Sequence, residues 1–489
     1  MLSNKKTNSF QKRAYFIGIK GVGMTMLAQF LKKRAWLVSG SDVQDSFLTD
    51  QVLASAKIKV FSPFSVNNLP SQKTDLIVYS SAYTVDNNSE LNFIFNHPEF
   101  FKSSKILSYA AALGEIFNQY KGIAVCGTHG KTTTTAYLGY VLQKAGIKPN
   151  VLVGSRVPQF KGSSLHGSSP YFIAEIDEYQ NKLRYFKAQG VILNNIDYDH
   201  PDFFPNLSAY RQVFQDFISR LSNRNFLVYN KSDLNIAKII SQTKAKLISY
   251  KIVKENFSND EADYLAYNLK TKGRYQSFRL NYHGHDWGEF KTFLWGEHNI
   301  ANALAVIASA RQLKVAKEDI RKYLKTFRGT ERRNQVLGYY QGAMIIDDYA
   351  HHPTEIKATL QALRNHFPNK KIITVFHPHT FSRTKALLID FAKSFFKVDE
   401  LIILAIYGSA REQKGGVSGR DLVKSVKEFN KLKGIKQSVH YIPSLEKAMS
   451  NLEKRLNENQ ILILLGAGDV FRLGQALLAK SAKNKNSKN

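Results

Sequence analysis

The chain has 489 residues, 43% of them hydrophobic, with 69 lysines and arginines against 39 acidic residues and a formal net charge of +30. This length leaves room for about three domains with separate cores, and no stretch approaches the roughly 20 apolar residues of a membrane-spanning helix. Because the N-terminus also lacks the apolar region of a signal peptide and Cys126 is the single cysteine, we exclude a disulfide framework and expect a soluble, cytoplasmic protein.

The first predicted domain spans residues 1–119 and opens as a strand, a glycine turn, a helix and a second strand. The strand AYFIGI runs into Gly18-x-Lys20-Gly21-x-Gly23, and the helix MTMLAQFLKKR leads to the strand WLVSG. This order predicts a Rossmann-like unit, with DLIVYSSA as a later strand of the same sheet. A turn without a ligand remains an alternative explanation of the glycines, although a lysine beside a helix N-terminus suits a diphosphate.

The second predicted domain, residues 120–326, repeats this order around the sharpest motif in the chain. Between the strand GIAVCG and a helix stands GTHGKTT, residues 127–133. Glycines let backbone N–H groups approach phosphate oxygens, Lys131 can neutralise phosphate charge, and Thr132 can hold Mg²⁺. Val125 stands where the full GxxxxGK[ST] pattern has its first glycine, so the motif is a variant phosphate loop.

Acidic residues follow two later strands of this domain, in AEIDEYQ and NNIDYDH. Alone, such residues are more often surface turn or cap residues. The carboxyl ends of parallel strands meet at one edge of a sheet, however, and the phosphate loop lies on that same edge. Magnesium prefers hard oxygen ligands, so we expect a ligand-binding crevice there. The residues concerned are Glu175, Asp177, Glu178, Asp197, Asp199 and His200.

The third predicted domain, residues 327–489, contains short buried-strand runs that alternate with helical stretches. Two of its motifs, DDYAHHP at 347–353 and HPHTFSR at 377–383, concentrate histidines, and the second ends with Arg383. Histidines can exchange protons near neutrality, and the planar arginine fork matches a carboxylate or a phosphate. Each motif alone is as compatible with packing as with chemistry. The C-terminal KSAKNKNSKN is predicted to be a solubilising basic tail.

The chain is therefore predicted to be an α/β protein with a Rossmann-like N-terminal domain, a central P-loop ATPase-like domain and a Rossmann-like C-terminal domain. In the right order, its motifs resemble those of the Mur ligases over roughly residues 14–475, and within that family the branch that ligates L-alanine to UDP-N-acetylmuramate. These motifs are GTHGKTTT, LWGEHNIANALA, FRGTERRNQVLG, DDYAHHPTEI, FHPHTFSRTKALL, GGVSGRDL and LLGAGDVF. Two positions depart from the family pattern: Gln180 replaces the last acid of EADESD, and Lys20 replaces a glycine.

The resemblance implies an ADP-forming ligase of peptidoglycan precursor synthesis that uses ATP and Mg²⁺. The muramate carboxylate attacks the γ-phosphate, and the amine of L-alanine then attacks the acyl phosphate. This chemistry is physically sensible because in-line phosphoryl transfer mainly requires positioning and charge neutralisation. We expect no nucleic-acid partner and no membrane insertion, and the oligomeric state stays open.

The resemblance also implies roles for individual residues. ATP would be held by Gly127, Thr128, His129, Gly130, Lys131, Thr132 and Thr133, with Asn299 and Asn302 near the adenine, Arg333 near phosphate and Asp348 near the ribose. Metal ions would be bound by Thr132, Glu175 and His200, and the UDP-sugar by Gly18, Gly21, Gly23, Ser80, Ser81 and His129. Tyr349, His379 and Arg383 would bind the amino acid, and the catalytic residues would be Lys131, His200, His351 and Arg383.

Three alternatives stay open from the sequence. The nearest is a recycling ligase that attaches a tripeptide to the same nucleotide sugar, although FHPHTFSRT favours the single-amino-acid enzyme. A basic P-loop ATPase acting on nucleic acid would explain the net charge, but it leaves the third-domain motifs without a role. A nicotinamide dehydrogenase that uses Gly18 to Gly23 would not explain the second phosphate loop.

Overall fold

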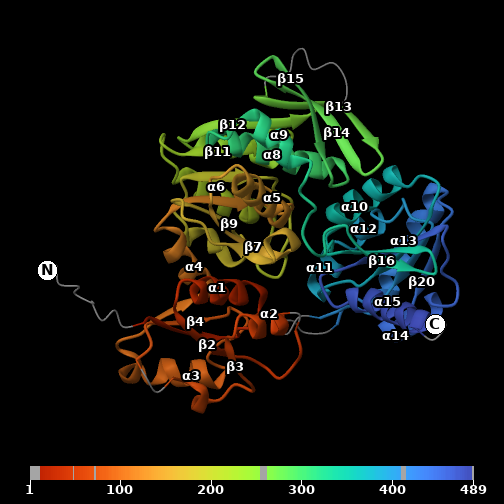
Figure 1. Ribbon diagram of the computed structural model, residues 1–489. Helices are drawn as coiled ribbons and strands as arrows, with labels where there is room; N and C mark the ends of the chain where they lie inside the picture. Colours follow the sequence, from red (N-terminus) through yellow and green to blue (C-terminus); the bar gives the residue numbers. More distant parts are fainter. Residues whose placement is uncertain (1–10, 48, 71–72, 254–261, 409–414, 487–489) are drawn as a thin grey trace.

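The protein consists of three α/β units that follow one another along the chain (Figure 1). The computed structural model describes residues 11–47, 49–70, 73–253, 262–408 and 415–486. Each unit is built around one mainly parallel sheet, of five, ten and six strands respectively. The predicted three-domain α/β fold is confirmed by this architecture. Part of the predicted basic tail lies outside the described residues, as do the first ten residues of the N-terminus.

The N-terminal sheet is parallel throughout, in the order β3-β2-β1-β4-β5. Its central strand β1 is almost wholly buried because both faces are covered by helices, which suits its apolar sequence RAYFI. The strand order reverses between β1 and β4, and ligands of open α/β sheets bind outside the carboxyl ends at such a point. The strands are β1 (Arg13–Ile17), β2 (Leu37–Ser41), β3 (Lys59–Phe61), β4 (Leu76–Tyr79) and β5 (Lys105–Ser108), and the helices are α1 (Val22–Lys33), α2 (Thr49–Ser55), α3 (Ser89–Asn96) and α4 (Tyr109–Phe117).

The central sheet has the order β15-β14-β13-β12-β11-β10-β6-β9-β7-β8, and β13, β14 and β15 form an antiparallel extension at its edge (Figure 1). Helices α5 and α8 pack against each other and are buried on most sides, so they lie in the core rather than on the surface. The strands are β6 (Lys121–Cys126), β7 (Asn150–Val157), β8 (Gly162–Leu165), β9 (Tyr171–Glu175), β10 (Gly190–Leu193), β11 (Phe226–Asn230), β12 (Lys246–Ile252), β13 (Tyr264–Lys272), β14 (Tyr275–Tyr282) and β15 (His285–Thr292). The helices are α5 (Lys131–Lys144), α6 (Leu207–Ser219), α7 (Leu234–Ala237), α8 (Glu297–Gln312) and α9 (Lys317–Leu324).

The C-terminal sheet has the order β16-β17-β21-β18-β19-β20, parallel except for the β16–β17 pair. Strands β17, β18 and β21 are adjacent, so the predicted motifs that follow β17 and β18 reach the same sheet edge. The strands are β16 (Gln335–Tyr340), β17 (Ala343–Asp348), β18 (Lys371–Phe376), β19 (Glu400–Ile403), β20 (Ser438–Tyr441) and β21 (Gln460–Leu465). The helices are α10 (Pro353–His366), α11 (Phe381–Ala386), α12 (Leu388–Ala392), α13 (Gly419–Lys433), α14 (Leu445–Leu452) and α15 (Phe471–Asn486).

None of the helices in the described ranges combines the length and the apolar character that crossing a bilayer would require. The central and C-terminal units touch through the loops at the carboxyl ends of their strands. A buried ion pair between Asp199, after β10, and Arg383, in α11, spans this contact. The edges that carry the predicted site residues therefore face each other.

Candidate active site

The phosphate loop joins β6 to α5 with a backbone that only glycine adopts without strain at two positions. Gly127 has φ of 116° and Gly130, the N-cap of α5, has φ of 79°. A Cβ on Gly127 would lie 2.7 Å from the carbonyl oxygen of Asn195, so the loop packs tightly against the end of β10. The Asn195 side chain accepts a hydrogen bond from the His129 backbone N–H at 2.8 Å. The loop is thus fixed with the N-terminus of α5 open toward an anion.

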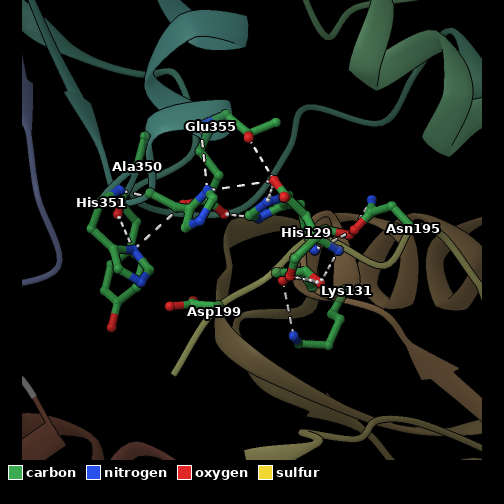
Figure 2. A network of polar contacts seen from close by, with 12 residues as sticks. His129, Lys131, Asn195, Asp199, Ala350, His351 and Glu355 are labelled. Atoms are coloured by element: carbon green, nitrogen blue, oxygen red, sulfur yellow. Dashed lines mark hydrogen bonds and ion pairs between the residues drawn. The ribbon is translucent and has the colours of Figure 1, made fainter. Parts of the chain in front are cut away.

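Lys131 begins α5 and turns its ammonium group back over the loop (Figure 2). Its Nζ donates to the carbonyl oxygens of Gly127 and Thr128 at 2.6 and 3.0 Å, and to Glu178 Oε2 at 3.1 Å. Burial lowers the pKa of Lys131, but the carboxylates of Glu178, Asp177 and Glu175 together outweigh burial and raise it above the ordinary value. The loop therefore carries a fixed positive charge.

Glu175, at the end of β9, lies against Thr132 of the phosphate loop. Its carboxylate accepts hydrogen bonds from the Thr132 hydroxyl and the Gly154 N–H, yet its Oε2 is buried without a hydrogen-bond partner. Burial raises the pKa of Glu175 above its usual range, which means that the ionised form is short of compensating charge. A divalent cation beside Thr132 and Glu175 would supply that charge.

A second acidic group lies beside Lys131. One ligand atom from each of Asp177, Glu178 and His200 falls within 4.8 Å of the others, which suits a cation. Glu178 is buried and accepts a hydrogen bond from the Tyr210 hydroxyl at 2.7 Å, so its orientation is fixed. The resemblance assigned His200 to a metal but not Asp177 or Glu178, although both stand in the acidic motif. The three side chains converge because β9 and β10 flank β6 in the sheet.

A cavity of about 810 Å³ opens beside the phosphate loop, between the central and C-terminal units. It has the size of a nucleotide site and combines an apolar wall with a few polar groups. Seven of the residues expected to bind ATP line it: His129, Gly130, Thr133, Asn299, Asn302, Arg333 and Asp348. The wall also includes residues that stand in the quoted motifs but were given no role there, among them Asn194, Asn195, Trp295 and Glu355.

Asn299 and Asn302 project from one face of α8 and are held by a chain of hydrogen bonds. Asn299 donates to the Trp295 carbonyl oxygen at 2.6 Å and accepts from Asn302 at 3.1 Å, and Asn302 accepts from the Thr134 hydroxyl at 3.2 Å. These hydrogen bonds link Thr134 in the first turn of α5 to α8 and to Trp295 before it. They hold the two asparagine side chains in place on the cavity wall.

Asp348 ends β17 and faces the same cavity. Its two oxygens accept backbone N–H groups of Asn334 and Ala350, both at 2.7 Å. Burial raises the pKa of Asp348 to about 6, against the lowering effect of Arg333 and these hydrogen bonds. The carboxylate is therefore held in a fixed orientation at the carboxyl edge of the C-terminal sheet. There it can accept a hydrogen bond from a hydroxyl group in the cavity.

His129 lies between carboxylates from both units (Figure 2). Its Nε2 is 3.1 Å from Asp197 Oδ2, and its Nδ1 is 3.3 Å from Glu355 Oε1. Burial would lower the pKa of His129, but the two hydrogen-bonded carboxylates raise it to about 9. His129 is therefore an imidazolium at neutral pH and adds a second positive charge to the phosphate loop.

Tyr349 and His351 follow β17, and His379 follows β18. The rings of Tyr349 and His351 are 5.3 Å apart, and those of His351 and His379 are 6.3 Å apart. Burial and the nearby Arg383 charge lower the pKa of His351 to about 3, so it is neutral. Its Nδ1 is 3.0 Å from the Tyr349 carbonyl oxygen, which fixes the proton on Nδ1 and leaves Nε2 as an acceptor.

Arg383 is only 5% exposed, and its guanidinium group forms a bidentate ion pair with Asp199 of the central unit. Its Nε donates to Asp199 Oδ1 at 2.8 Å and its Nη2 to Oδ2 at 3.3 Å. The same charge holds the pKa of Asp199 well below its usual range, although burial acts in the opposite direction. Arg383 therefore ties α11 to the loop that carries His200.

The residues expected to bind the nucleotide sugar, His129 apart, are brought together on the N-terminal sheet. Gly18 follows β1, and Ser80 and Ser81 follow β4, so they meet where the strand order reverses. Gly21 caps α1, and a Cβ on Gly23 would lie 2.7 Å from the Tyr109 ring. His129 belongs instead to the central phosphate loop, and both of its ring nitrogens face carboxylates there.

Lys20 does not extend its ammonium group toward a diphosphate. It is buried, and its Nζ donates to the carbonyl oxygens of Val43 and Asp45 at 2.9 and 2.8 Å. The Lys20 backbone N–H donates to Asp42 at 2.6 Å. The carbonyl oxygens of the loop after β2 thus take up the charge that the sequence suggested would suit a diphosphate.

Three family models match successive parts of the chain. They are described as Mur ligase family, catalytic domain, over residues 13–121; Mur ligase middle domain, over residues 125–310; and Mur ligase, glutamate ligase domain, over residues 332–468. Together they span most of the chain, and each falls on one of the three sheets.

Similar proteins extend over almost the full length. A UDP-N-acetylmuramate–L-alanine ligase of Caldanaerobacter subterraneus is 36% identical, with 96% of this chain and 98% of that protein covered. One of Borreliella burgdorferi is 37% identical, with 94% and 97% covered. The crystal structure of a UDP-N-acetylmuramate-alanine ligase from Thermotoga maritima superposes with a TM-score of 0.79 at 24% identity, over 96% of this chain and 99% of that one. A murein peptide ligase from Psychrobacter arcticus has the same fold, with a TM-score of 0.70 at 20% identity, over 96% and 98%.

Proposed function

The chain belongs to the Mur ligase family, and from this membership we propose that it joins L-alanine to the carboxylate of UDP-N-acetylmuramate with cleavage of ATP to ADP and phosphate. The product would enter peptidoglycan precursor synthesis in the cytoplasm. The observation that carries the proposal is that a phosphate loop, a nucleotide-sized cavity and the C-terminal histidine and arginine motifs meet in one place. This place is the contact between the central and C-terminal units, which is called the seam below.

The residues at this seam fit Mg²⁺ and ATP. The unpartnered buried oxygen of Glu175 lies beside the Thr132 hydroxyl, which is the hard-oxygen pair that Mg²⁺ prefers. Thr132 and Glu175 would hold one ion and His200 a second, and such ions offset the charge of transferring phosphates. Gly127 to Thr133 would hold the phosphates, with Arg333 beside them, while the chain of Asn299 and Asn302 would face the base and Asp348 a ribose hydroxyl.

The first chemical step would be attack of the muramate carboxylate on the γ-phosphorus, with release of ADP and formation of an acyl phosphate. Lys131 and the imidazolium of His129 supply two positive charges that are already in place, so little reorganisation is needed as charge moves. Gly18, Gly21, Gly23, Ser80 and Ser81 would hold the nucleotide sugar on the N-terminal sheet and present its carboxylate.

In the second step the amine of L-alanine would attack the acyl carbon, and the phosphate would leave with one former carboxylate oxygen. His351 is neutral, so it does not repel an incoming ammonium group, and its Nε2 can accept an N–H. With a pKa of about 3, His351 would orient the amine without retaining its proton, which would pass to the departing phosphate, the stronger base. Tyr349, His379 and Arg383 would complete the amino-acid site.

The proposal is tested by phosphate release from ATP with UDP-N-acetylmuramate and a panel of acceptors. We expect L-alanine to support the highest kcat/KM and L-leucine a much lower one. The panel includes a cell-wall tripeptide and double-stranded nucleic acid. Preference for the tripeptide would identify a recycling ligase, and ATP turnover stimulated by nucleic acid alone would identify an ATPase of a different class.

A further prediction concerns the metal. We expect Thr132→Ala and Glu175→Gln to raise the Mg²⁺ concentration for half-maximal rate by about tenfold or more, because the first removes a hard-oxygen ligand and the second replaces a charged carboxylate oxygen by a neutral amide oxygen. The measurement is a Mg²⁺ titration of initial rate at saturating ATP. Asp177→Asn tests the neighbouring carboxylate group in parallel. Unchanged titrations for the first two variants and a large shift for the third would move the ion to Asp177, Glu178 and His200.

A further inference from the structure

Glu355, in the first turn of α10, contacts three of the predicted site residues, although the sequence motifs assigned no role to Glu355 itself. Its Oε1 is 3.3 Å from His129 Nδ1 of the phosphate loop and 3.6 Å from Arg333 Nη1. Its Oε2 accepts the His351 backbone N–H at 3.3 Å and lies 3.5 Å from His351 Nδ1 (Figure 2). One carboxylate thus contacts two residues expected to bind ATP and one expected to act in catalysis.

These contacts join two units of the fold. Glu355 and Arg333 belong to the C-terminal part of the chain, whereas His129 belongs to the central phosphate loop. The Glu355 side chain is 12% exposed, and the surrounding positive charges hold its pKa well below the usual range although burial acts the other way. The carboxylate is therefore ionised at neutral pH, and one of its oxygens faces His129 of the phosphate loop.

The charge state of His129 is set by groups from every element packed around it. Asp197, after β10, and Glu355, on α10, are hydrogen-bonded to its two ring nitrogens. His352, the N-cap of α10, lies with its ring 4.8 Å away, and His298 of α8 interacts with it through space. Both of these histidines have lowered pKa values and are neutral, so the two carboxylates dominate.

We propose that Glu355 is a positioning residue that keeps His129 charged in the phosphate loop. Through this contact, ATP binding would depend on the packing of α10 against the loop. The proposal rests on the proposed function only in taking ATP as the nucleotide in the cavity. His129 and Glu355 both line that cavity, so the charge of the imidazolium lies at the site where the phosphates would bind. Neutral His129 would offer the phosphates a dipole in place of a charge.

The test is Glu355→Gln, with MgATP affinity measured by calorimetry at pH 6.0 and pH 8.5. With two carboxylates the pKa of His129 is about 9, so its charge in the parent persists through this range. With one carboxylate the pKa falls, and the charge is lost as pH rises past it. We expect affinity at pH 6.0 to be unchanged or higher, and affinity at pH 8.5 to fall about tenfold relative to the parent, on the order of one charge-assisted contact.

The control is Glu331→Gln, which removes another carboxylate from the cavity wall, one that pairs with Arg156 at 2.5 Å. It should leave the pH dependence of the parent intact. In a His129→Asn background, Glu355→Gln should no longer alter the pH dependence. Equal loss of affinity at both pH values would mean that Glu355 is merely structural, and identical pH profiles for parent and variant would overturn the proposal. These readouts need no ligation, so failure of the alanine assay leaves them interpretable.

Discussion

Replacing Lys131 by alanine should lower the ligation rate by about 10²–10³-fold while nucleotide-sugar affinity changes little. The lysine places a fixed charge on the phosphate loop, and removing one preorganised electrostatic contact commonly costs this much in kcat. The glycines and serines expected to hold the sugar lie on a separate sheet. Steady-state rates and calorimetry with the nucleotide sugar measure the two effects separately.

Loss of Lys131 also leaves the buried carboxylate of Glu178 without its ion-pair partner, which by itself destabilises a protein by about 3–5 kcal/mol. The double variant Lys131→Ala, Glu178→Gln removes that uncompensated charge. It should regain most of the lost melting temperature without regaining activity. Lys144→Ala, in the last turn of the same helix, is the matched control and should behave as the parent. An equal loss of sugar affinity in Lys131→Ala would contradict the division of the two sites.

Replacing Arg383 by lysine should lower kcat/KM for L-alanine by about 10²-fold although the charge is kept. A lysine can satisfy only one oxygen of Asp199, whereas the guanidinium donates to both. The loss of one charge-assisted hydrogen bond in this buried place should also cost about 2 kcal/mol of unfolding free energy. Alanine saturation curves and thermal unfolding measure the two effects.

The matched control is Arg364→Lys, because Arg364 also pairs with an aspartate, Asp399, but on the far side of the C-terminal unit. It should leave the alanine dependence unchanged. If Arg383→Lys lost stability and kept the full rate and alanine dependence, Arg383 would be a purely structural tie between the units. The amino-acid site would then need other residues.

The phosphate loop and the strand-end acids could be predicted because they depend on short-range rules. Gly127 and Gly130 are needed for positive φ, and Thr132 and Glu175 meet because strands on one edge end together. The three-domain fold followed from the alternation of strands and helices. The residue assignments within the site came from the family resemblance, and they stay predictions.

What could not be predicted depends on contacts between residues distant in the chain. Asp199 and Arg383 are 184 positions apart, and nothing near either of them indicates the other. Glu355 stands in a motif that was noticed for its histidines, and its partner His129 belongs to another unit. The orientation of Lys20 was set by carbonyl oxygens of the loop after β2, which carry no signal in the sequence.

The most direct test of the ligase mechanism is the fate of oxygen from the substrate carboxylate. UDP-N-acetylmuramate labelled with ¹⁸O in both carboxylate oxygens is incubated with ATP, Mg²⁺, L-alanine and the protein, and the products are analysed by mass spectrometry. An acyl phosphate requires one labelled oxygen to leave with each inorganic phosphate and one to stay in the new amide. Label in AMP, or unlabelled phosphate alongside the alanyl product, would contradict this account.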